Sequence, residues 1–367
     1  MRFGPKQLRF LKQLLPFVAI WTLFGLLYTL IEYGILGSHP IYPATGNQYN
    51  FQANLTYSLP ASMLMGIVQG ITELLWLKKL LQSRTVWKKI LLKTFIYVVL
   101  ICIFLLALTS ITNYINIQYL ELDKTVSEEV KSFFYSFSFW TVVLYVGVAV
   151  LLTLFVSEVQ DYVGGSIFEN FLLGKYHSPI QEERIFMFLD MRSSTSIAEK
   201  MGHQHYFNLM RDYYSDMTDA IVETDGEIYQ YVGDEVVISW PKTKGLYRLN
   251  CLHCYYKIKQ SINHRSDYYQ NTYGLQPAFK AGMHLGEVTT GEIGILKKEI
   301  IYTGDVLNTT ARIQSKCNLF NADLLVSRAL IDQLKLPTSY QIIAVDRLQL
   351  RGKSAYTELC TILRDTA

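Results

Sequence analysis

The sequence predicts an α-helical membrane domain followed by an α+β domain, and two features of the chain favour this division. Half of its 367 residues are apolar; up to about residue 157 they form long runs, whereas the rest of the chain has the mixed composition of a globular domain. From residue 184 onward, runs of strand length alternate with amphipathic stretches of helix length, and hairpins occur beside crossover helices. That mixture is typical of an α+β fold rather than of a doubly wound sheet.

Four segments reach the roughly 20 apolar residues that a helix needs to cross a bilayer. They are residues 14–36, 57–77, 90–111 and 137–156. Basic residues precede the first segment and fill the connection between the second and third, whereas the stretch 37–54 has no Lys or Arg, which places both termini in the cytoplasm. We therefore expect residues 1–157 to form a lipid-embedded domain of four transmembrane helices in the inner (plasma) membrane, rather than to begin with a cleaved signal peptide.

Two acidic residues, Glu32 and Glu73, lie within the predicted spans. An acid at membrane depth is a candidate for function, but both lie near span ends, where a carboxylate can reach the membrane interface, so a sensing role stays open. Residues 158–182 are the predicted linker, in which a short helix ends before Gly174. This helix is either a spacer or a coupling element that pairs two chains.

Charge and cysteine content exclude some functions. A net charge of +3 is too small to indicate a nucleic-acid partner. The five cysteines form no disulfide framework, and the lone CxxC of Cys251 and Cys254 is expected to mark two positions on one helix.

Run length, alternation and turn residues define the elements of the second part. In chain order, we expect a strand at 185–189, a helical stretch at 195–224, a hairpin of 227–231 and 236–240, a helix at 246–264, a hairpin of 278–285 and 287–291, a strand at 300–303, a helix at 305–317, a strand at 324–326, a helix at 327–334, and strands at 340–344 and 356–361.

Two aspartates stand at the ends of predicted strands. Asp190 ends the first strand and is followed by a polar turn that opens a helix, and Asp234 lies in the Gly-Asp turn of the first hairpin. Two carboxylates brought together suit a hard divalent cation, and a helix N-terminus beside them suits a phosphate chain. This combination predicts phosphoryl chemistry.

Five motifs follow one another in the second part: FLDMRSST (188–195), YVGDEVVISW (231–240), AGMHLGEVTTGEIG (281–294), TGDVLNTTARIQ (303–314) and LRGK (350–353). With these motifs, residues 183–363, essentially the whole of the predicted domain 183–367, resemble the catalytic domain of class III nucleotidyl cyclases, the adenylate and guanylate cyclases. The resemblance implies a ferredoxin-like core, a mixed sheet with flanking helices, and a lyase that makes a 3′,5′-cyclic nucleotide and pyrophosphate.

The resemblance also implies which residues bind metal and phosphate. Asp190 and Asp234 match the family's metal-binding aspartates, so two Mg²⁺ or Mn²⁺ ions per site are expected, with the backbone of Met191 as a further metal contact. The turn that holds Ser194 and Thr195 is expected to bind phosphate oxygens through its N–H groups.

Further residues match positions that the family uses in catalysis. Asn308 and Arg312, four apart on one helix face, match the transition-state pair that orients the ribose and reaches the reacting phosphorus. Lys353 matches a lysine that binds the terminal phosphates. Lys280 has either a similar role or that of a solvated strand lysine, and His284 is expected to be structural.

The two positions that read the base, Gln230 and Ile301, fit neither the usual adenylate nor the usual guanylate pattern. A Gln amide can present a donor and an acceptor in either order, and an Ile offers only apolar contact, so poor discrimination is expected. We take ATP as the substrate by family frequency, with a guanylate or base-promiscuous cyclase as the alternative.

The number of catalytic domains predicts the assembly. The family draws the aspartates from one subunit and the Asn/Arg pair from the other, so a chain with one domain is expected to form a homodimer with two equivalent sites. A non-catalytic receptor that keeps the cyclase fold is the second hypothesis, favoured by the altered base positions and disfavoured by the retained catalytic set. A transporter or channel is disfavoured because polar residues are scarce in the spans.

Overall fold

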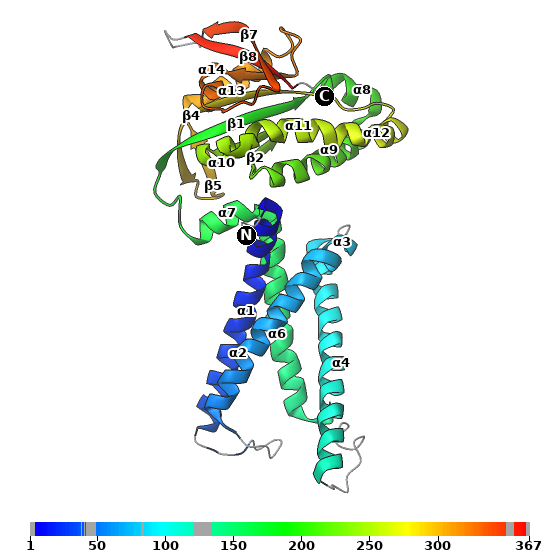
Figure 1. Ribbon diagram of the computed structural model, residues 1–367. Coiled ribbons are helices and arrows are strands. Elements are labelled where there is room, and N and C mark those ends of the chain that lie inside the picture. The colour runs from blue at the N-terminus through cyan, green and yellow to red at the C-terminus, as the bar shows by residue number, and fades with distance from the viewer. Residues whose placement is uncertain are drawn as a thin grey trace. The chain divides into compact units, whose positions relative to one another are not determined.

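The computed structural model describes residues 4–37, 39, 41, 49–81, 84–120, 134–349 and 356–364. The chain divides into two compact units, which are described separately below. The helical unit is Leu8–Phe168, and the sheet unit is Glu169–Ala367 together with Met1–Gln7. All of the large sheet's strands belong to the sheet unit (Figure 1).

Long helices build the helical unit. They are α1 (Pro5–Leu36), α2 (Phe51–Thr72), which continues into a π-helical turn (Glu73–Leu77) and α3 (Lys78–Leu80), then α4 (Val86–Leu120) and α6 (Phe137–Val163). Among the described residues, three helices are long and apolar enough to cross a membrane: Pro5–Leu36, Phe51–Leu77 and Phe137–Val163. The fourth expected span, 90–111, lies within α4, but its later side chains fall outside the described part, so four spans are not confirmed.

A buried polar cluster joins three of these helices. The Lys93 ammonium of α4 forms ion pairs with Glu73 and, at 3.3 Å, with Glu158 of α6, and Glu73 is only 2% exposed. One turn earlier in α2, Gln69 accepts a hydrogen bond from Trp21 of α1. Glu73 therefore does not reach out to an interface but neutralises a buried lysine, as charges in an apolar environment require.

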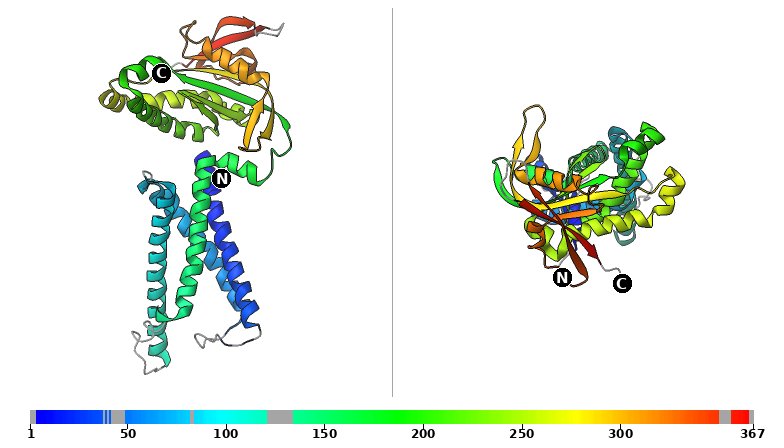
Figure 2. Two further views of the ribbon diagram at one scale, coloured as in Figure 1. Left: turned by 180° about the vertical axis from the view of Figure 1, so that it is seen from behind. Right: turned by 90° about the horizontal axis from the view of Figure 1, so that it is seen from above.

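The sheet unit is built on one mixed sheet. Its strands are β1 (Ile180–Met191), β2 (Glu227–Val232), β3 (Glu235–Pro241), β4 (Phe279–Ile293), β5 (Glu299–Thr303), β6 (Leu324–Ser327), β7 (Tyr340–Gln349) and β8 (Tyr356–Arg364). They lie in the order β2-β3-β1-β4-β6-β8-β7, and β5 pairs with β4. The β4–β6 pairing is parallel and the other pairings are antiparallel. Figure 2 shows the β7–β8 hairpin at one end of the sheet.

The helices of this unit are α7 (Gly165–Leu172), which begins in the helical unit, α8 (Ser194–Met201), α9 (His203–Glu223), α10 (Lys242–Leu246), α11 (Asn250–His264), α12 (Ser266–Tyr273), α13 (Asp305–Ser315) and α14 (Arg328–Ile331). The mixed sheet with flanking helices is the expected cyclase architecture, and α7 occupies the expected linker helix.

Alternation along β1 separates two cores. Ile185, Met187 and Leu189 belong to the main core, which contains residues of α9 and α11. Phe186 and Phe188 belong to a smaller cluster on the opposite face, which includes residues of α13. By the same alternation, Asp190 lies on the α13 side of the sheet, so the fold places α13 next to the first acid.

The expected hairpin of 278–285 and 287–291 is wrong, because one continuous strand, β4, runs through Gly286. A Cβ at Gly286 would lie 2.9 Å from the Val306 Cβ of α13, so this glycine serves close packing and not a turn. The helical stretch 195–224 is broken at Gly202, where φ is +79°. The helix expected from residue 246 begins at Asn250, after α10 and a 3₁₀ turn (Tyr247–Leu249), and α12 was not predicted.

Candidate active site

Strand register brings the two predicted acids together. Asp190 pairs across β1 and β3 with Glu235. Asp234 directly precedes Glu235, in a tight turn where Gly233 has φ of +62°. The hydroxyl of Tyr214 on α9 anchors this turn by donating a hydrogen bond to the Gly233 carbonyl at 2.9 Å. The Asp234 carboxyl therefore faces that of Asp190, and burial together with this neighbour raises the pKa of Asp234.

Asp190 is held by an amide and by a cation, whereas one carboxylate oxygen of Asp234 has no such contact. Asp190 Oδ2 accepts a hydrogen bond from Gln314 Nε2 at 3.0 Å and forms an ion pair with Lys280 Nζ at 3.2 Å. Asp234 Oδ2 is buried and has no hydrogen-bond partner among the described residues. An orphaned carboxylate oxygen beside a second carboxylate has the character of an incomplete cation site.

The charge balance points the same way. Burial, and after it the charges of Asp190 and Asp234, raise the pKa of Glu235 to about 7, and the opposing charge of Lys280 offsets only part of this effect. The described part of the chain contains no group of three His, Cys, Asp or Glu side chains arranged to hold a metal. A pair of carboxylates with one unpartnered oxygen fits Mg²⁺ or Mn²⁺, because such ions bind through one or two carboxylates and complete their shells with water and substrate phosphates.

The predicted phosphate-binding turn opens beside the acids. Ser193 adopts a left-handed conformation (φ 58°) immediately before α8, and Ser194 begins that helix within hydrogen-bonding reach of Asp234. Arg192 fixes the turn by donating to the Ala322 carbonyl at 2.8 Å and to Asp323 Oδ1 at 3.0 Å. Thr195 is exposed in the first turn of α8. This role of Arg192 was not predicted from the sequence, although its place inside FLDMRSST was a signal.

Helix α13 presents two sets of side chains. Gln314 is buried and reaches Asp190. Asn308 is exposed, Arg312 is half-buried, and neither side chain has a hydrogen bond or ion pair within the described residues. The chain therefore brings Lys280 and Gln314 to the acids, but it does not bring the predicted transition-state pair into contact with them. Gln314 was not predicted, and its amide at the end of an otherwise matched motif was the available signal.

The two residues expected to recognise the nucleotide base each lie next to a tyrosine in the sequence, and these two tyrosines contact each other. Gln230 is exposed on β2, and Ile301 is half-buried on β5. Their neighbours Tyr229 and Tyr302 pack with ring centroids 4.8 Å apart. Tyr302 also contacts Phe186, which is four residues, about 13 Å, from Asp190 along β1. Lys353 lies outside the described residues.

Two other polar features are structural, as expected. His284 Nδ1 lies 2.7 Å from Ser327 Oγ, within the sheet. Cys251 and Cys254 are buried on α11, and burial raises the pKa of each thiol to about 12, so neither is a reactive thiolate.

Comparison with known proteins identifies the class to which this fold and acid pair belong. Residues 177–362 match the family described as the adenylate and guanylate cyclase catalytic domain, and the chain belongs to that family.

Its relatives carry a more particular name. "Adenylate cyclase 2" of Rhizobium meliloti (strain 1021) is 33% identical over 200 residues, which cover 54% of this chain and 55% of that protein. The "Adenylate cyclase" of Anabaena cylindrica is 24% identical over 207 residues, which cover 51% of this chain and 40% of that protein. The chain thus spans about half the length of these relatives or less.

A solved structure shares the fold. A bacterial light-regulated adenylyl cyclase matches with a TM-score of 0.50 and 19% identity, covering 59% of this chain and 64% of that one. At this identity the likeness establishes the architecture alone.

Proposed function

We propose that this protein is a membrane-bound adenylate cyclase that converts ATP to 3′,5′-cyclic AMP and pyrophosphate. The observation that carries the proposal is the acid pair: Asp190 and Asp234, whose Oδ2 has no hydrogen-bond partner among the described residues, meet at the start of α8, within a family whose matched relatives are named adenylate cyclases. In the reaction, the ribose 3′ oxygen bonds to the α-phosphorus, the bond to the β-phosphate oxygen breaks, and the hydroxyl proton is lost to solvent or a nearby base.

Each site residue has a task in this scheme. Asp190 and Asp234, with the Met191 backbone, hold two Mg²⁺ or Mn²⁺ ions, which when bound lower the cost of charge on the attacking and leaving oxygens. The turn before α8, with Ser194 and Thr195, donates hydrogen bonds to phosphate oxygens.

The remaining residues act on phosphate and sugar. Lys353 and Lys280 neutralise phosphate charge, although Lys280 first has to release Asp190. Asn308 orients the ribose. The guanidinium N–H groups of Arg312 donate hydrogen bonds to the phosphoryl oxygens on which negative charge develops.

Two copies of the chain complete the proposed site. Asn308 and Arg312 have no partner among the described residues and do not contact the acids of their own chain. This supports a homodimer in which each site takes its acids from one copy and the Asn/Arg pair from the other. The proposal also divides the chain into a transmembrane domain (1–157), a linker (158–182) and a catalytic domain (183–367). The protein would cross the inner membrane several times and hold its catalytic domain in the cytoplasm. The apolar helices and the distribution of basic residues support this arrangement.

The test is a product assay with purified protein, Mn²⁺ and, in parallel, ATP, GTP, CTP and UTP. We expect cyclic AMP as the main product and measurable cyclic GMP, because Gln230 and Ile301 discriminate weakly between purines. A larger yield of cyclic GMP would make the protein a guanylate cyclase. Nucleotide binding without any cyclic product would instead favour the non-catalytic receptor.

A further inference from the structure

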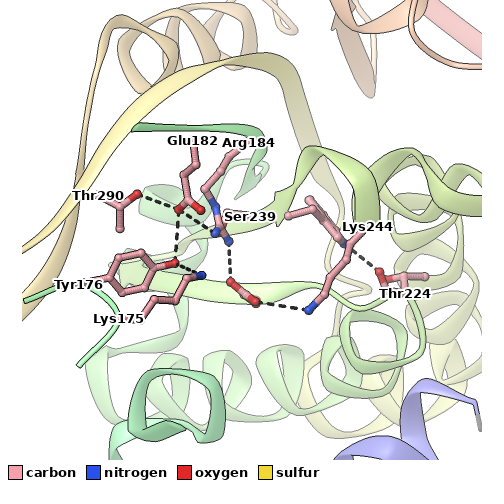
Figure 3. Close-up of polar contacts among 10 residues, drawn as sticks. Lys175, Tyr176, Glu182, Arg184, Thr224, Ser239, Lys244 and Thr290 are labelled. Atoms are coloured by element: carbon pink, nitrogen blue, oxygen red, sulfur yellow. Dashed lines mark hydrogen bonds and ion pairs between the residues drawn. The ribbon is translucent and has the colours of Figure 1, made fainter. Parts of the chain in front are cut away.

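A fully buried arginine stands on the same face of β1 as Asp190, six residues earlier. Arg184 is 1% exposed, and its guanidinium forms ion pairs with Glu227 of β2 and, at 3.2 Å, with Glu182. It also donates to Ser239 Oγ of β3 at 3.0 Å (Figure 3). A buried charge is costly unless it is paired in this way, so the three partners fix the guanidinium in one place.

A layer of aromatic rings packs beside this guanidinium. Arg184 Cζ lies 4.7 Å from the centroid of the Tyr302 ring, which suits a cation–π contact. Tyr302 in turn contacts Tyr229 and Phe186, with centroids at 4.8 and 5.4 Å. Because Tyr229 precedes Gln230 and Tyr302 follows Ile301, this layer ties together the two strands that carry the base positions.

The same cluster receives the end of the linker. Glu182 Oε1 accepts hydrogen bonds from Thr290 of β4 at 2.8 Å and from the buried Tyr176 hydroxyl at 3.3 Å (Figure 3). The Tyr176 carbonyl accepts a hydrogen bond from the Glu292 N–H of β4 at 3.0 Å. The Arg184 cluster thus holds β1, β2, β3, β4 and the linker in one arrangement.

We propose that Arg184 is a positioning residue that sets the preference between adenine and guanine by fixing β2 and β5 through Tyr229 and Tyr302. This inference rests on the proposed cyclase function. An amide that can present either hydrogen-bonding order and an apolar side chain do not select a base by their chemistry alone. Selection then depends on where Gln230 and Ile301 are held, and the layer behind them is what holds them.

The variants separate positioning from general support. Arg184→Lys keeps the charge but loses the planar fork and its stacking. Tyr302→Leu removes the ring and leaves the Arg184 ion pairs in place, and Tyr302→Phe keeps the ring. Arg265→Lys is the matched control, because Arg265 pairs with Asp216 at 2.6 Å and lies over the Tyr268 ring at 4.0 Å, among helices and not beside β2 or β5.

The measurement is kcat and KM of the full-length protein with Mn-ATP and Mn-GTP, beside a thermal melt. We expect Arg184→Lys and Tyr302→Leu to change the ATP-to-GTP ratio of kcat/KM by at least about fivefold, which is about 1 kcal/mol, mainly through KM. Tyr302→Phe and Arg265→Lys should leave the ratio within about twofold. A merely structural role would lower kcat and melting temperature for both nucleotides at a constant ratio, and that result overturns the proposal.

The outcome stays decisive if a variant or the enzyme is inactive. If Arg184→Lys does not fold, Tyr302→Leu carries the test alone. If the wild type makes no cyclic product, displacement of a fluorescent nucleotide measures the affinities for ATP and GTP instead. The same fivefold change, now in the ratio of these affinities, is then the criterion. A shifted binding ratio without turnover would refute the cyclase function and support the positioning role. A protein that binds no nucleotide would overturn both.

Discussion

At the scale of single residues, α13 shows how two neighbouring side chains take separate tasks. Gln314 turns inward and donates to Asp190, so it orients an acid of its own chain. Arg312, two residues earlier, has no ion pair among the described residues and stays available to a group outside the chain. In the proposed function, Arg312 stabilises the negative charge that develops on the phosphoryl group.

Replacing Arg312 by Ala should therefore lower turnover more than binding. We expect kcat to fall by about 100-fold or more, because a fixed donor for developing charge is lost, while the affinity for ATP changes by less than about threefold. Single-turnover product formation and displacement of a fluorescent nucleotide measure the two quantities. Equal losses in both would mean that Arg312 acts on the bound substrate before reaction.

At the scale of elements, the packing of α13 on β4 sets the position of these side chains. A Cβ at Gly282 would lie 2.4 Å from the backbone nitrogen of Gln314 and 2.7 Å from its Cα, and backbone atoms cannot rotate out of the way. Gly282 thus lets the backbone of α13 pack directly against β4.

Gly282→Ala should push α13 away from β4. We expect a loss of about 1–3 kcal/mol of stability from overpacking, together with reduced turnover, because Gln314 and Arg312 move with the helix. Chemical denaturation followed by circular dichroism measures the first effect. The control is Gly165→Ala, where the nearest atom, Gln160 Nε2, is 3.9 Å away. Unchanged stability in the Gly282 variant would contradict this view of the contact.

The same element shows what the sequence could and could not predict. The hydrophobic runs predicted Asp190 and Asp234 at strand ends, and the register of β1 with β3 brings the two side chains together. The hairpin expected around residue 286 was wrong, because a glycine is compatible both with a turn and with close packing against a helix, and the sequence alone does not distinguish the two. The contacts of Gln314, Arg192 and Arg184 join distant parts of the chain, and no local pattern predicts such partners.

At the scale of the whole molecule, the proposed site is shared by two chains, and mixing inactive variants tests this. Asp190→Ala chains and Arg312→Ala chains are each expected to be inactive. In a mixed dimer one of the two sites keeps intact acids and an intact arginine, so random pairing should restore about a quarter of wild-type activity.

The control for this mixture is a pair of variants from the same set, Asp190→Ala with Asp234→Ala. Neither site of that mixed dimer keeps both acids, so no activity should return. Absence of recovery in the first mixture, with mixed dimers verified by two affinity tags, would contradict a shared site.

The most direct test of the account is cyclic AMP formation by Asp190→Asn and Asp234→Asn proteins. Both changes keep side-chain shape, and Asp234 Oδ2 has no hydrogen bond to lose within the described part of the chain. Asp332→Asn, which changes an exposed acid that pairs with Arg328 one helical turn away, is the control. We predict that both acid variants lose at least about 100-fold of the rate with Mn-ATP while their melting temperatures and that of the control stay close to wild type. A rate above one-tenth of wild type in either acid variant would contradict the central claim that these two carboxylates carry the reaction.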